Sequence, residues 1–137
     1  MMLLRLVRVL FIFPLFLLTL PVCYAESPDS AKSLDKYELE ELVLDKTASC
    51  RKEKDKSHCV NYFSPEGVLM QLRDSGKRKD GRWFLDDSDR LCILWNGKLK
   101  PLCFVVTKND DGTYNMVKSG KHKSTILELK DGNTENL

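Results

Sequence analysis

The sequence contains little of what enzymes usually need at an active site. Its 137 residues include only two histidines, His58 and His122, and neither belongs to a recognisable motif with a nucleophile. A Gly-x-Ser-x-Gly nucleophile elbow and a glycine-rich phosphate loop are both absent. We therefore predict that the protein is not an enzyme. The alternative is an enzyme of unknown type that uses one of the two histidines.

Motifs that hold metals or cofactors are missing as well. The five cysteines include no Cys-x-x-Cys pair, which is usual in zinc sites, haem attachment sites and redox-active pairs. The acidic run of Asp86, Asp87 and Asp89 lacks the Asp-x-Asp-x-Asp-Gly spacing of a calcium loop. We expect no metal and no cofactor.

Residues 1–25 have the pattern of a cleaved secretory signal. Arg5 and Arg8 precede an apolar run over 9–20, and the small residue Ala25 offers a cleavage site. We predict a periplasmic or secreted protein with no stable membrane span after cleavage. The alternatives are an uncleaved membrane anchor, for which the apolar run is short, and a lipoprotein modified at Cys23.

Net charge is small, but its distribution is informative. Removal of residues 1–25 leaves 20 basic and 20 acidic side chains, so no general attraction to nucleic acid is expected. Residues 26–45 hold seven acids and two bases, whereas residues 46–123 hold seventeen bases and ten acids. The basic middle of the chain is either an ordinary solvated surface or a patch for a protein or a small anionic ligand.

Cleavage after Ala25 leaves four cysteines, an even number that favours disulfides in an exported chain. Cys92 and Cys103 lie in candidate strands that are adjacent in sequence. Directly opposed positions on such strands bring the two Cβ atoms within bonding range. This pairing leaves Cys50 with Cys59. We favour this connectivity among the three that are possible.

Turn signals divide the chain after residue 60 into short apolar segments. The candidate strands are 60–63, 68–73, 82–85, 90–95, 102–107, 113–118 and 124–129. The turns between them are rich in Gly, Asp and Asn and include Lys79-Asp80-Gly81 and Ser119-Gly120. This rhythm predicts a mainly β fold, an antiparallel meander of about seven short strands that could close into a small lipocalin-like barrel.

The meander is preceded by one short N-terminal helix over 34–44, which Ser33 is expected to cap. Residues 47–57 are read as a charged loop, or as a hairpin tip tied at its base by Cys50 and Cys59. The predicted organisation is a signal peptide (1–25), a flexible leader (26–33), one β-rich domain (34–130) and a frayed polar tail (131–137).

Alternation gives packing detail for one hairpin. If Cys92 lies opposite Cys103, one side of the hairpin carries Leu91, Ile93, Leu102 and Phe104, and the other carries the disulfide, Leu94 and Val105. We expect one side to line the interior of a curled sheet and the other to be covered by the helix over 34–44.

Several short motifs resemble a family of small exported bacterial proteins of unknown function. They are Glu38–Leu42 with Lys46-Thr47, Tyr62–Leu69, Gly81-Arg82-Trp83, Asp86-Asp87, Leu91–Trp95, Cys103 and Asp111–Tyr114. Asp45 stands where the family has Gly, and Cys50 and Cys59 are not part of its pattern. The resemblance implies a periplasmic or secreted β-rich domain and supports pairing Cys92 with Cys103, and it implies no activity.

Two tryptophans and a basic cluster are the candidate contact residues. Trp83 and Trp95 are read as core residues or, alternatively, as the wall of a ligand cup. The basic cluster consists of Lys77, Arg78, Lys79 and Arg82. The leading prediction is an exported, non-enzymatic binding or interaction module of the bacterial cell envelope, contacted at loops 51–58 and 77–82. The alternative is a small-ligand carrier with a Trp-lined cup.

Overall fold

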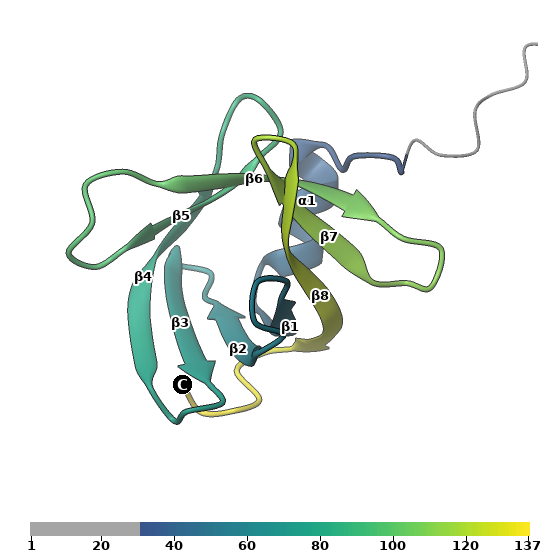
Figure 1. Ribbon diagram of the computed structural model, residues 1–137. Coiled ribbons are helices and arrows are strands. Elements are labelled where there is room, and N and C mark those ends of the chain that lie inside the picture. Colours follow the sequence, from purple (N-terminus) through teal and green to yellow (C-terminus); the bar gives the residue numbers. More distant parts are fainter. Residues whose placement is uncertain (1–30) are drawn as a thin grey trace, which may run out of the picture.

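The computed structural model describes residues 31–137, which form a closed antiparallel barrel of eight strands with one helix (Figure 1). The elements are α1 (Lys36–Val43), β1 (Lys46–Lys52), β2 (His58–Phe63), β3 (Val68–Arg73), β4 (Arg78–Leu85), β5 (Leu91–Trp95), β6 (Leu102–Lys108), β7 (Tyr114–Lys118) and β8 (Lys121–Asp131). Each strand pairs with the next in sequence, and β8 returns to pair with β1. The predicted mainly β fold, closed as a small barrel with one short helix, is confirmed.

The predictions for residues 1–25 and most of the leader lie outside the described residues. Within residues 31–137, no helix has the length and apolar content needed to cross a bilayer. The two disulfides described below suit the periplasm or the cell exterior, because both compartments are oxidising.

The strand that the sequence did not indicate is β1. Residues 47–57 were read as a loop or hairpin tip, and only Glu53–Ser57 form the turn. The charged residues obscure the alternation of this strand. Its buried, inward-facing positions are Ala48 and Cys50. Cys50 lies directly opposite Cys59 in the register, so the disulfide does join the two arms of this hairpin.

Helix α1 closes one end of the barrel. Asp35, not Ser33, is its N-cap: the Asp35 carboxylate accepts a hydrogen bond from the Glu38 amide at 2.8 Å, and Glu38 accepts one from the Asp35 amide at 2.9 Å. Ser33 cannot cap because it is bridged to Thr107 in extended conformation. The fully buried Leu39 and Val43 then point from α1 into the barrel core.

The barrel interior changes character from one end to the other. At the α1 end the inward side chains are apolar and tightly buried, and the core there is formed by Phe63, Leu69, Trp83, Leu91, Val106 and Ile126. Toward the opposite end the inward positions of β2 and β3 become polar, with Asn61 and Gln71 followed by Arg73. One end of the barrel is therefore a sealed core and the other an open mouth.

The β5–β6 hairpin has the predicted register, with Cys92 opposite Cys103, and the predicted disulfides are both present. Its Leu91 and Ile93 side faces the interior, as expected. The helix does not cover the opposite side, however, because Leu39 and Val43 belong to the same core as Leu91 and Ile93. Packing against the closed end buries more of the apolar face of α1 than the outer wall would.

Gly81 was read as part of a turn, but it lies inside β4, opposite Trp95. The turn itself comes earlier, where Gly76 adopts a positive φ of 78°. A Cβ atom at Gly81 would lie 2.5 Å from the Leu94 carbonyl oxygen and 3.1 Å from the Trp95 ring. Glycine is needed here because β5 and the indole approach the backbone closely.

Both ends of the described chain are held against the barrel. The Lys108 amide donates to the Lys32 carbonyl at 3.3 Å and Ser33 is bridged to Thr107, so the last part of the expected leader (26–33) extends along β6. The tail that was expected to be frayed is also bound: the Thr134 amide donates to Thr47 Oγ1 at 3.1 Å, and Thr47 Oγ1 donates to the Gly132 carbonyl at 2.5 Å. These bonds explain why Thr47, an outward polar residue, is buried.

Candidate functional site

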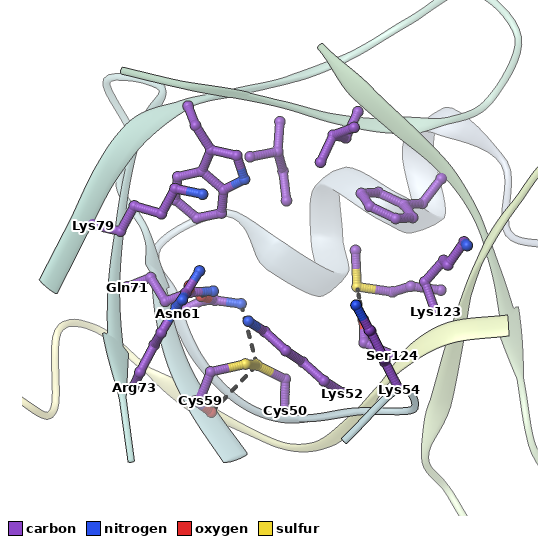
Figure 2. A pocket seen from close by; sticks show the side chains of 15 residues that line it. Cys50, Lys52, Lys54, Cys59, Asn61, Gln71, Arg73, Lys79, Lys123 and Ser124 are labelled. Atoms are coloured by element: carbon purple, nitrogen blue, oxygen red, sulfur yellow. Dashed lines mark hydrogen bonds between the residues drawn. A yellow bond between two sulfur atoms is a disulfide. The ribbon is translucent and has the colours of Figure 1, made fainter. Parts of the chain in front are cut away.

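A cavity of about 310 Å³ occupies the open mouth of the barrel (Figure 2). Figure 2 looks into it, with α1 visible behind the cavity at the closed end. The lining comes from β1 to β8 and from the β1–β2 turn. It divides into a disulfide on β1 and β2, a polar wall, an apolar wall and a basic rim.

The polar wall is a row of side chains connected by hydrogen bonds. Asn61 and Gln71 are direct neighbours on β2 and β3, and Gln71 is opposite Lys79 on β4. Arg73 Nε donates to Gln71 Oε1 at 3.2 Å, and Gln71 Nε2 donates to Asn61 Oδ1 at 2.8 Å. Asn61 Nδ2 then lies 3.4 Å from Sγ of the disulfide-bonded Cys50. The register of three adjacent strands thus produces a continuous polar strip.

The apolar wall faces the cavity from β5, β6 and β7. It consists of Ile93, Trp95, Leu102, Phe104 and Met116. Trp95 joins the two walls, because the Lys79 Nζ atom lies 4.3 Å from the centroid of its ring, within cation–π distance. The cavity therefore offers a ligand both apolar contact area and polar groups.

The basic rim consists of Lys52, Lys54, Arg73, Lys79 and Lys123. No acidic side chain lines the cavity, and none of the five cations has a carboxylate within 4 Å among residues 31–137. Burial, followed by the nearby charges of Arg73, Lys52 and Lys98, lowers the pKa of Lys79 below its usual range. The mouth is a region of uncompensated positive charge.

Glu53 holds one side of this rim in place. Its backbone amide donates to the Lys123 carbonyl at 2.9 Å, which ties the β1–β2 turn to β8. Its carboxylate is paired with Lys56 and accepts a hydrogen bond from Thr125 Oγ1 at 3.0 Å. These two interactions, with Lys56 the stronger, lower the pKa of Glu53 to about 2. The acid thus positions the turn that carries Lys54 and directly follows Lys52.

The structure separates the predicted contact residues. Trp95 and Lys79 line the cavity, but Trp83 lies in the sealed core, where its Nε1 donates to the Ser64 carbonyl at 3.0 Å and its ring packs edge-on against Phe63. The other predicted cations, Lys77, Arg78 and Arg82, are exposed and lie outside the cavity lining. The two predicted histidines also lie outside that lining.

Sequence reasoning missed Asn61, Gln71, Arg73 and Lys123, whereas Lys52 and Lys54 lie within the predicted contact loop 51–58. A signal was available for part of the missed set. Cys59, Asn61 and Phe63 alternate on β2, and Leu69, Gln71 and Arg73 alternate on β3, so polar residues occupy inward positions of buried strands. An amide at a position that alternation assigns to the interior is unusual enough to indicate a site.

One other group of ligating atoms occurs in the described part of the chain. Carboxylate and sulfur atoms of Asp86, Cys92 and Cys103 lie within 4.8 Å of one another. The two sulfurs are joined in a disulfide, and Asp86 accepts a hydrogen bond from Arg90 Nε at 2.8 Å. This group therefore has no free thiolate to offer a metal.

Comparison of the chain with protein-family models, with curated proteins and with solved structures finds no match. The resemblance to small exported bacterial proteins stays a prediction. The geometry of the cavity is therefore the basis for an argument about function.

Proposed function

We propose that the protein is an exported, non-enzymatic binding module of the bacterial cell envelope, and that its binding site is the open mouth of the barrel. The observation that carries the proposal is the cavity of about 310 Å³, which has one apolar wall and five rim cations without acidic partners among the described residues. Concave sites with mostly apolar lining and a few convergent polar groups are typical of small-ligand binding.

A binding role is favoured over catalysis because the cavity does not bring a base to a nucleophile. Ser124 is the hydroxyl-bearing residue of the lining, and its Oγ donates to Met116 Sδ at 3.4 Å. His122 Nε2 lies 2.9 Å from Thr125 Oγ1, which belongs to the Glu53 cluster outside the lining. Neither residue has the arrangement that activates a nucleophile.

The test is retention of a ligand by protein exported from its native host. We expect native mass spectrometry to show a one-to-one adduct that denaturation releases. Ser124→Phe should abolish the adduct, because the ring would occupy the cavity. Val117→Phe adds the same bulk on the outer face of the neighbouring strand and should leave it intact. If the wild type also carries no adduct, under reduced and under oxidised conditions, the result counts against the proposal.

A protein partner is the second candidate. Lys77, Arg78 and Arg82 are exposed on the β3–β4 hairpin and have no carboxylate within 4 Å in residues 31–137. An acidic partner surface would be complementary to this hairpin. Charge reversal at Lys77 and Arg78 should weaken such a complex and leave the adduct in the cavity unchanged. Loss of the complex in Ser124→Phe alone would instead place the partner at the mouth.

A further inference from the structure

The donor and acceptor groups of the polar wall determine how each of its amide side chains is oriented. A guanidinium group has only donors, so the Gln71 atom 3.2 Å from Arg73 Nε must be the amide oxygen. Gln71 Nε2 then donates a hydrogen bond to Asn61, so the Asn61 atom at 2.8 Å must be the amide oxygen. Each amide oxygen thereby accepts one hydrogen bond within the row, and the orientation of each amide follows from the arginine.

The wall consequently offers donors to the cavity. Each amide nitrogen of Asn61 and Gln71 carries two N–H groups, of which one is used within the row, and the Arg73 guanidinium keeps its terminal nitrogens. Asn61 and Gln71 are only 7% and 6% exposed, so their remaining N–H groups have little contact with bulk solvent, whereas Arg73 is half-buried. Buried donors without acceptors are costly, and a ligand that supplies acceptor atoms would remove that cost.

The charge around the wall selects the same chemistry. Lys79 extends over Trp95 beside Gln71, and Lys52 reaches in from β1 (Figure 2). These cations share one mouth without a carboxylate within 4 Å among the described residues, and burial, followed by the neighbouring positive charges, lowers the pKa of Lys79. Acceptor atoms that also carry negative charge would relieve this repulsion, and they would form charge-assisted hydrogen bonds.

An inorganic anion would leave the other half of the site unused. The apolar wall of Ile93, Trp95, Leu102, Phe104 and Met116 faces the same space. At about 30 Å³ for each water-sized group, a cavity of about 310 Å³ holds roughly ten non-hydrogen atoms. This is the size of an anionic headgroup with a short alkyl chain.

We propose, resting on the function proposed above, that the ligand is an amphipathic anion of about ten non-hydrogen atoms. Its headgroup is bound by Arg73, Gln71 and Asn61 with Lys79, and its alkyl chain lies on the apolar wall. Medium-chain carboxylates and short alkyl phosphates share this chemistry.

The test is a titration of the oxidised mature protein with octanoate, followed by calorimetry and by Trp95 emission. Pentyl phosphate, which like octanoate has about ten non-hydrogen atoms, is the second anionic probe, and the tighter-binding of the two identifies the headgroup. 1-Octanol and octyltrimethylammonium keep the chain without the negative charge, and acetate keeps the charge without the chain. We expect one-to-one binding of the anionic probes, at least tenfold tighter than binding of the other three.

Variants assign the two halves of the site. Arg73→Gln and Lys79→Gln should each weaken octanoate binding about tenfold, whereas Lys77→Gln and Arg78→Gln remove the same charge nearby and should change it less than twofold. Leu102→Ser should reduce the advantage of octanoate over acetate. Unfolding curves for every variant separate a binding defect from loss of the fold.

The outcomes distinguish this inference from the proposed function. Equal binding of 1-octanol and octanoate, or unchanged octanoate affinity in Arg73→Gln and Lys79→Gln, would overturn the ligand class and leave a binding mouth in place. No binding of any probe, together with no adduct on protein exported from its host, would overturn both.

Discussion

Replacing Gly81 by alanine would force β4 and β5 apart, because the new Cβ atom on β4 would meet the backbone of β5. The added Cβ atom would be 2.5 Å from the Leu94 carbonyl oxygen, 3.0 Å from Trp95 Cα and 3.1 Å from the Trp95 ring. Two of these three atoms belong to the backbone, so a change of side-chain rotamer cannot relieve the contact. The strand pair itself has to move, although Gly81 pairs directly with Trp95 in the ladder.

Overpacking of this kind typically costs about 1–3 kcal/mol. Because the nearest contact falls well below a van der Waals separation and is with backbone, we expect a loss of about 2 kcal/mol in the free energy of unfolding. For a domain of this size that loss lowers Tm by roughly 8–12 °C. The shift of Trp95 should also change its emission, because its ring forms part of the cavity wall.

Urea unfolding followed by tryptophan fluorescence and circular dichroism measures the effect. Gly97→Ala has open space around the new Cβ but a φ of +79°, so its loss reports the strain of a positive φ, which Gly81→Ala does not incur. The cost of Gly81→Ala should persist in a Trp95→Phe background, because the closest atom is the Leu94 carbonyl oxygen. A loss below 0.5 kcal/mol with unchanged emission would refute the reasoning.

Three further predictions concern stability. Replacing Cys92 and Cys103 together by alanine should lower the free energy of unfolding by about 3 kcal/mol, because the disulfide restricts the short loop in the unfolded chain. A reduced wild type that melts at the same temperature as the oxidised protein would contradict this. Asp35→Ala removes the capping box and should cost about 1 kcal/mol, whereas Asp35→Asn should cost less, as urea midpoints would show. Because the folded pKa of Glu53 is about 2, below the ordinary 4.5, its carboxylate stabilises the fold above pH 4.5, and that contribution is lost as pH falls toward 2. Glu53→Gln should therefore flatten the fall of the urea midpoint between pH 4.5 and 2, and an unchanged slope would count against it.

The local signals in the sequence predicted the barrel well where turns and alternation agree. The strand over 68–73 was predicted with its observed bounds, and the register of Cys92 against Cys103 followed from two adjacent apolar strands. The pairing of β1 with β8 that closes the barrel could not be predicted, since it joins segments far apart in sequence and three of the seven residues of β1 are charged. The turn prediction at Gly81 was wrong because the sequence alone does not distinguish a glycine required by close packing from one required by a turn.

The candidate site was predicted only in part, for a related reason. Trp95 and Lys79 stand out as residue types, and both line the cavity. Asn61, Gln71 and Arg73 come together through the pairing of β2 with β3, and a one-residue change of register would have turned them outward. The site is a property of the register of several strands, whereas single motifs report only one strand at a time.

The positions of the two disulfides determine how the barrel would respond to a pulling force. Each joins neighbouring strands of one hairpin, β1 to β2 and β5 to β6, and neither crosses the junction between β1 and β8. A load applied at the two chain ends would therefore unzip β8 from β1 without breaking a covalent bond. The stretched chain would nevertheless stay short. The loops between Cys50 and Cys59 and between Cys92 and Cys103, with separations of 9 and 11 residues, would withhold about 70 Å of contour length until a reductant released them.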